Sequence, residues 1–178
     1  ASQILFPFVE GEISELEFSN LVEETYKVFE TSDVVNLVEL EKNQLVLELF
    51  HGPTLAFKDL AMQLLGALLD YFSKKQGKRI AVLGATSGDT GAAAISACSR
   101  YSNVEVFILY PHGRVTEVQR RQMTTSEAKN VHALAIETDF DGCQAMVKDM
   151  FLDSTMTKED TRLIAANSIN WTRCMTQS

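Results

Sequence analysis

The sequence predicts an α/β protein in which βαβ units build a parallel sheet. From residue 79 onward, short apolar runs alternate with helical patterns of about 10–15 residues, the order that a parallel sheet requires. Small and hydroxylic residues fill the first strand-to-helix turn, at 85–91. The composition, 46% hydrophobic and 22% charged over 178 residues, is that of an ordinary globular protein. This length suggests one domain or slightly more.

Three elements are predicted before the alternating region: a helix over 14–31, a strand over 45–50 and a helix over 59–76. The first helix opens with a capping box, because Glu17 follows Ser14 by three residues. Gly77 stands where the second helix needs a C-terminal cap. The alternating region is predicted to hold strands at 79–84, 104–110 and 131–136, helices at 92–100, 115–126 and 141–152, and a last apolar piece at 163–166.

The negative charge is concentrated at the front of the chain. Residues 1–50 carry a net charge of −9, whereas residues 51–178 carry +1. A chain without a broad basic face is not expected to bind nucleic acid, and the acidic front is most simply a solvated helix. No apolar run reaches the roughly 18 residues of a membrane-spanning helix, and no secretory signal is expected at the start.

The cysteines and histidines show no pattern of a disulfide framework or a metal site. The three cysteines are Cys98, Cys143 and Cys174. Scattered cysteines without a CxxC pair indicate free thiols in a reducing compartment, so a cytoplasmic location is expected. The three histidines are far apart and lack ligand spacing, so no metal is expected.

The turn 85–91, ATSGDTG, is the first candidate site. It lies between a predicted strand and a predicted helix, at the sheet edge where α/β proteins bind ligands. Its free amides and hydroxyls can cradle an anion, and Gly88 and Gly91 let the backbone approach one. A tight turn with an ordinary helix cap explains the segment equally well. Asp89 would repel a bound carboxylate unless it accepts from a protonated group; it could also be a plain N-cap.

Lys58 is the second candidate, in the segment HGPTLAFKD at 51–59. The apolar residues before it favour partial burial, and a lysine in an apolar setting can form a Schiff base with an aldehyde. A surface pair with Asp59 is the alternative. His51 is more simply a hydrogen-bonded loop residue than a general base.

The segment NSINWTR at 167–173 is the third candidate. It offers the donors Asn167, Ser168 and Asn170, and Arg173 could pair with a phosphate through two hydrogen bonds. From these residues alone, a helix cap with a solvated arginine is the favoured interpretation.

Together, the segments at 51–59, 85–94 and 166–171 resemble the threonine synthase family of the microbial type, which comprises pyridoxal-phosphate enzymes of the tryptophan-synthase-like fold. They read HGPTLAFKD, ATSGDTGAAA and ANSINW. ILYPHG at 108–113 and DFDGCQAMVKDMF at 139–151 are also similar to that family. The likeness runs, with gaps, from about residue 11 to the end.

The resemblance implies a lyase that converts O-phosphohomoserine and water to threonine and phosphate, the final step of threonine biosynthesis. Lys58 would carry the Schiff base with pyridoxal 5'-phosphate and move protons between substrate carbons. Asp89 would face the cofactor. The implied substrate contacts are Thr86, Ser87, Gly88 and Thr90 at the carboxylate, and Asn167, Ser168, Asn170 and Arg173 on the phosphate side.

The resemblance also implies that this is an internal portion of the enzyme. The family's Gly/Asn-rich loop for the cofactor phosphate and its hydroxyl residue at the pyridine nitrogen are not in this sequence. We expect residues 1–78 in the large domain, 79–165 as the small domain, and 166–178 returning to the large one. The alternatives are threonine dehydratase or cysteine synthase, which typically carry Asn in place of Asp89, and a non-catalytic module for a small anion. The oligomeric state, monomer or homodimer, is left open.

Overall fold

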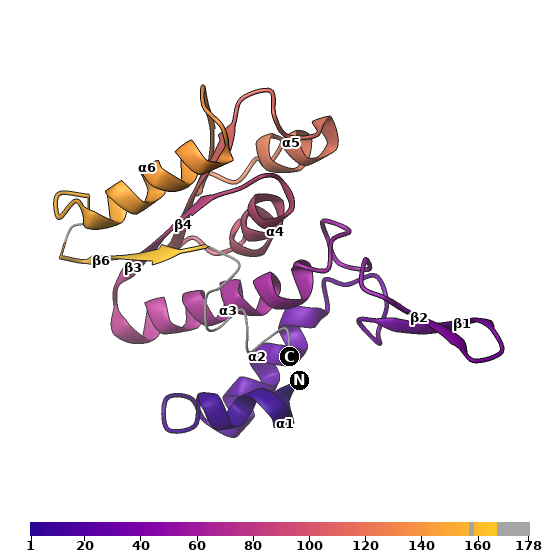
Figure 1. Ribbon diagram of the computed structural model, residues 1–178. Coiled ribbons are helices and arrows are strands. Elements are labelled where there is room, and N and C mark those ends of the chain that lie inside the picture. The colour runs from indigo at the N-terminus through magenta and orange to yellow at the C-terminus, as the bar shows by residue number, and fades with distance from the viewer. Residues whose placement is uncertain (157–158, 167–178) are drawn as a thin grey trace.

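The computed structural model describes residues 1–156 and 159–166, and Figure 1 shows its elements. They are α1 (Ser2–Leu5), η1 (Phe6–Phe8), α2 (Glu15–Tyr26), β1 (Asn36–Glu41), β2 (Gln44–Glu48), α3 (Asp59–Gln76), β3 (Arg79–Ala85), α4 (Asp89–Cys98), β4 (Val104–Pro111), α5 (Glu117–Thr124), β5 (Val131–Ile136), α6 (Phe140–Leu152) and β6 (Thr161–Ala165). The expected parallel sheet is confirmed: four strands in the order β5-β4-β3-β6, with every neighbouring pair parallel.

The parallel sheet is covered on both faces. Because side chains alternate along a strand, β3 and β4 send residues to two separate cores. Val82 and Val106 join the cluster that contains α3 and α4, whereas Leu83 and Leu109 join the cluster of α6. Figure 1 shows α6 and α3 on opposite sides of the strands. Burial on both faces explains why these strands read as nearly continuous apolar runs.

Helix α3 is buried between two layers and is therefore apolar around most of its circumference. Leu65 packs into the sheet cluster, while Leu64 and Leu68 pack against the N-terminal helices. Gly66 lets α4 come close, since a Cβ at that position would lie 2.9 Å from the carbonyl oxygen of Ala97. The predicted C-terminal cap is confirmed: Gly77 has φ +63° and its N–H donates to the carbonyl of Lys74.

Helix α2 begins as predicted but ends earlier. The capping box of Ser14 and Glu17 is present in both directions. The helix stops at Tyr26 rather than near residue 31. Beyond it, the backbone N–H of Glu30 donates to the carbonyl of His51 at 3.0 Å, a contact that a continuing helix would not allow.

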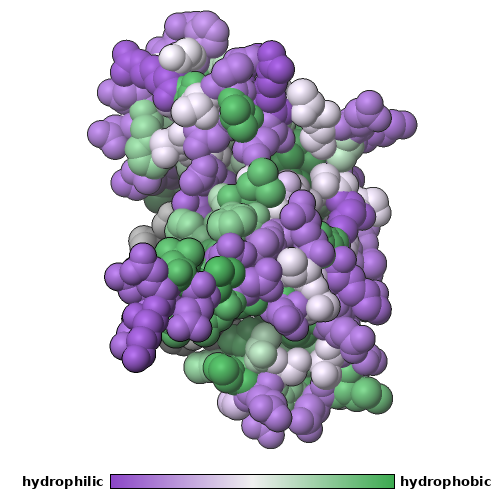
Figure 2. Space-filling model, turned by 90° about the vertical axis from the view of Figure 1, so that its right-hand side faces the viewer, coloured by the Kyte–Doolittle hydropathy of each residue, from purple (hydrophilic) through white to green (hydrophobic). Residues whose placement is uncertain are grey.

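The predicted strand at 45–50 is present as β2, but it lies outside the parallel sheet. It pairs antiparallel with β1, which the sequence analysis did not predict, and Leu37 faces Leu47. The turn between them uses Asn43 at φ +68°. Figure 1 shows this hairpin projecting from the body. On the face toward which it projects, apolar residues gather across the middle and lower part (Figure 2). The exposed apolar residues of the hairpin are Leu37, Val38, Leu40, Leu45, Val46 and Leu47.

A single buried amide joins the end of α4 to the beginnings of β4 and β5. The Asn130 Nδ2 donates to the carbonyls of Cys98, Tyr101 and Val104 at 3.1, 3.0 and 2.8 Å. Burial raises the pKa of the Cys98 thiol to about 12. Cys98 and Cys143 are both free and buried. Within the described ranges, no helix combines the length and the apolar character needed to cross a membrane.

Candidate active site

The turn at 85–91 is held by Thr86, whose side chain is directed into the turn. The N-cap of α4 is Gly88, which has no side chain to cap the helix. The hydroxyl oxygen of Thr86, a residue that is 2% exposed, instead accepts from the N–H groups of Gly88 and Gly91, both at 2.9 Å. Gly88 has φ +147°, a conformation that other residues rarely adopt. Thr86 therefore acts as the helix cap from two residues upstream.

The same turn leaves two hydroxyls facing outward. Ser87 is exposed, Thr90 is half-buried, and both line a cavity together with Thr86. Neither hydroxyl has a hydrogen-bond partner among residues 1–156 and 159–166. The N–H of Gly88 is already donated to Thr86, whereas the side chains of Ser87 and Thr90 are available to a ligand.

The loop before α3 is fixed by a buried carboxylate. Asp59 is fully buried and accepts from the backbone N–H and the hydroxyl of Thr54 at 2.7 and 2.9 Å. Burial raises the pKa of Asp59, while the two hydrogen bonds from Thr54 act in the opposite direction. Gly52 has room only for hydrogen, because a Cβ there would lie 2.5 Å from the Cβ of Asp59. This arrangement rules out the alternative of a surface pair between Lys58 and Asp59.

Lys58 is partly buried, as predicted. Its side chain is 17% exposed, and its amine lies 4.4 Å from the centroid of the Phe57 ring. The amine also lies 3.5 Å from the Oδ2 of Asp89. Two candidates from separate segments, the lysine loop and the start of α4, are thus in contact. Asp89 is the first residue of α4 rather than its N-cap, so the plain N-cap interpretation is wrong.

Sequence analysis missed Gln119 of α5, which completes this contact. Its Nε2 donates to the Oδ1 of Asp89 at 2.6 Å. One local signal was available, since Thr116 and Gln119 have the spacing of a capping box, and the structure contains that box. The spacing indicates where α5 starts; it does not reveal that the side chain reaches α4.

His51 joins the hairpin to the lysine loop. Its Nε2 lies 2.8 Å from the Oε2 of Glu48 and 3.3 Å from the Nδ2 of Asn36. The interpretation of His51 as a hydrogen-bonded loop residue is confirmed.

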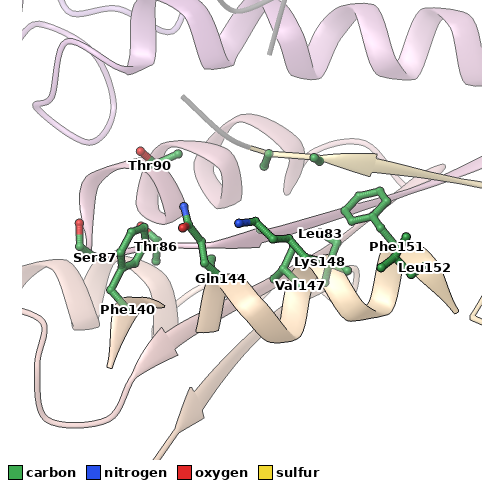
Figure 3. A pocket seen from close by; sticks show the side chains of 14 residues that line it. Leu83, Thr86, Ser87, Thr90, Phe140, Gln144, Val147, Lys148, Phe151 and Leu152 are labelled. Atoms are coloured by element: carbon green, nitrogen blue, oxygen red, sulfur yellow. The ribbon is translucent and has the colours of Figure 1, made fainter. Parts of the chain in front are cut away.

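A cavity of about 840 Å³ lies at the carboxyl ends of β3 and β6, beside α6. Figure 3 shows Gln144 and Lys148 projecting from α6 on the side of Thr90. The apolar part of the cavity lining includes Leu83, Phe140, Val147 and Phe151. Lys58 and Asp89 do not line this cavity. The turn at 85–91 therefore presents its hydroxyls to the cavity and its Asp89 carboxylate to the lysine.

The third candidate segment follows the described residues in the sequence. Asn167, Ser168, Asn170 and Arg173 lie outside the described residues, directly after Ala166, which lines the cavity. Across the part of the chain that the structure describes, no group of three or more His, Cys, Asp or Glu residues could hold a metal ion.

The chain is similar to known proteins in both sequence and fold. The chain is 56% identical to threonine synthase of Pseudomonas aeruginosa over 99% of its own length and 38% of that protein. It superposes on a crystal structure of PLP-bound threonine synthase from Brucella melitensis with a TM-score of 0.90 and 51% identity, covering 98% of this chain and 38% of that one. For threonine synthase from yeast the TM-score is 0.87 at 38% identity, with 98% and 37% covered. The chain thus spans less than two fifths of the length of these relatives.

More distant structures share the fold alone. Diaminopropionate ammonia lyase from Escherichia coli matches with a TM-score of 0.59 at 13% identity. The "Pyridoxal-phosphate dependent enzyme" family matches residues 36–172, which is most of the sequence. That range contains Lys58, Asp89 and the turn between β3 and α4. The chain belongs to the pyridoxal-phosphate dependent enzyme family.

Proposed function

We propose that the whole protein is a threonine synthase that converts O-phosphohomoserine and water to threonine and inorganic phosphate, with pyridoxal 5'-phosphate bound at Lys58. The observation that carries the proposal is the contact between the Lys58 amine and Asp89 beside a turn rich in hydroxyls. The names and identities of the similar proteins support it. Free, buried Cys98 and Cys143 support a reducing compartment, the cytoplasm.

The residues present fit the cofactor. Lys58 is shielded by Phe57 yet not fully buried, so its amine can reach an aldehyde. Asp89 offers a carboxylate to a protonated group and already lies beside the lysine. When bound, pyridoxal phosphate supplies an electron sink for carbanions formed on the substrate.

The chain's own residues supply binding and proton transfer. Ser87 and Thr90 donate to the substrate carboxylate near the start of α4, where the helix dipole also favours negative charge. Thr86 and Gly88 set the shape of that turn. The Lys58 amine takes protons from the substrate α- and β-carbons and returns protons to the γ- and α-carbons. Asn167, Ser168, Asn170 and Arg173 remain proposed for the phosphate side of the substrate.

We extend the proposal to the division of the chain. Residues 79–165 would form the small domain that carries the carboxylate-binding turn, and residues 1–78 would belong to the large domain. Lys58 and Asp89 would then approach each other from the two sides of this boundary.

Borohydride trapping tests the cofactor assignment on the full-length protein. Addition of pyridoxal phosphate should give a visible absorbance band, and borohydride should remove the band and leave the label on Lys58, as read by peptide mass spectrometry. Lys58→Ala should lose both signals, whereas Lys75→Ala, which removes an exposed lysine of α3, should keep them. A trapped label that persists in Lys58→Ala would contradict the assignment.

A phosphate-release assay tests the reaction. O-phosphohomoserine should yield threonine and phosphate in equal amounts. Turnover of threonine or of a β-substituted serine in its place would identify a dehydratase or a cysteine synthase instead. Binding of small anions without turnover of any of these substrates would identify a non-catalytic module.

A further inference from the structure

The carboxylate of Asp89 divides its two oxygens between two partners. Oδ2 faces the Lys58 amine at 3.5 Å, and Oδ1 accepts from the Gln119 amide at 2.6 Å. The Asp89 side chain is 44% exposed, so without a second contact it could turn to water. Gln119 supplies this second contact.

Gln119 is itself held in one orientation. Its Oε1 accepts from the hydroxyl and the backbone N–H of Thr116, at 2.8 and 3.4 Å. With the amide oxygen committed to these donors, the NH₂ group is the end that faces Asp89. The amide also packs over Gly88, where a Cβ would lie 2.3 Å from the Cδ of Gln119. The absence of a side chain at position 88 makes room for this contact.

Helix α5 also contacts the lysine loop, residues 51–59, directly and without the involvement of Asp89. The Nε2 of Gln122 donates to the carbonyl of Thr54 at 3.0 Å. Gln122 and Gln119 are the same residue type, one turn apart on one helix, and each donates one hydrogen bond across to another segment. Gln122 therefore provides a matched control for any effect of Gln119 on Lys58.

We propose that Gln119 is a positioning residue: it holds the Asp89 carboxylate against the Lys58 amine. Asp89 is the acid in ion-pair contact with Lys58 within residues 1–156 and 159–166, and the neighbouring Asp59 is turned toward Thr54. The amine also lies 4.4 Å from the centroid of the Phe57 ring. The catalytic significance of this arrangement rests on the proposed function; the positioning itself does not.

The test measures Lys58 directly, in the cofactor-free full-length protein. Lysine amines are labelled at one fixed pH with a limiting amount of ¹³C-formaldehyde by reductive methylation, and the labelling rate of Lys58 is read by peptide mass spectrometry, with Lys58→Arg identifying its peptide. In Gln119→Met, Lys58 should be labelled about threefold faster than in the wild type, because its amine loses a held partner. Gln122→Met should leave the labelling rate of Lys58 unchanged.

A double-mutant cycle shows whether Gln119 acts through Asp89. Asp89→Asn alone should speed the labelling of Lys58, and adding Gln119→Met to it should speed the labelling no further. An unchanged labelling rate in Gln119→Met would overturn the proposal, as would an equal acceleration in the Asp89→Asn background. If Gln119→Met does not fold, Gln119→Asn, whose amide is one methylene too short to reach, is measured in the same way. Absence of borohydride-trapped cofactor on Lys58 in the wild type would count against the proposed function alone.

Discussion

Replacing Thr86 by valine should destabilise the turn between β3 and α4 far more than its conservative size suggests. Valine has nearly the shape of threonine but cannot accept a hydrogen bond. The hydroxyl that it removes accepts from two backbone N–H groups, those of Gly88 and Gly91, both at 2.9 Å. Each buried donor left without a partner costs about 1–3 kcal/mol, so the two together should cost about 2–6 kcal/mol.

Thr86→Ser is the matched control. Serine keeps the oxygen and loses only a methyl group, whose contribution is about 1 kcal/mol. The Thr86→Val variant should therefore be less stable than the Thr86→Ser variant by at least about 1 kcal/mol, although valine is the more apolar residue. Substrate binding through Ser87 and Thr90 should survive in Thr86→Ser and weaken in Thr86→Val.

Hydrogen exchange followed by mass spectrometry measures this effect locally. Peptides that cover the start of α4 should exchange faster in Thr86→Val by tenfold or more, since tenfold corresponds to about 1.4 kcal/mol. Thr86→Ser should remain within a few-fold of the wild type. Equal exchange rates in the two variants would refute the assignment of Thr86 as the cap of α4.

Three further predictions concern stability and reactivity. Asn130→Ala removes a buried amide that donates to three backbone carbonyls, two of which keep a backbone donor, and should lower the denaturant midpoint by an amount that corresponds to about 1–3 kcal/mol; Asn130→Asp, which has the same shape without the donor, should be at least as destabilising. Because burial raises the pKa of Cys98 to about 12, its thiol should resist alkylation at pH 8 in the folded protein and react once urea unfolds it; rapid alkylation without urea would contradict this burial. Hydrogen bonds from Arg120 and Arg121 lower the pKa of Glu117 from 4.5 to about 2. A lowered carboxyl pKa stabilises the fold above pH 4.5 and loses that effect as the pH falls through about 2, so thermal melts of wild type and Glu117→Gln should converge across this range.

The parallel sheet could be predicted from the sequence because its strands carry strong local signals. The strands expected at 79–84, 104–110 and 131–136 match β3, β4 and β5 to within a residue at each end. Each is an apolar run bounded by turn residues; β3 and β4 are buried on both faces, whereas the edge strand β5 keeps Leu134 and Ala135 exposed. The hairpin carries a weaker local signal. Strand β1 mixes acidic and apolar residues, so the sequence predicted β2 but not its partner β1.

The site could be predicted only in part, for a geometric reason. Lys58 and Asp89 were each identified from their own segments, since the chemistry of each is local. Their contact depends on how α3 packs against α4, and no residue spacing encodes a distance across 31 positions. Gln119 is a stronger example, because its local pattern already had a sufficient explanation as a helix cap. Side chains with two roles of this kind are hidden from sequence analysis.

The strand order also determines when the sheet can be completed as the chain is synthesised. β3 pairs on one side with β4, which follows it closely, but on its other side with β6, about eighty residues later. Until residues 161–165 have left the ribosome, the N–H and C=O groups along that side of β3 have no strand to pair with. An open parallel edge is a template for misassociation during slow, long-range folding. Nascent chains that stop before residue 161 should therefore be prone to associate through this edge, and the cavity beside β3 and β6 forms only once β6 has paired.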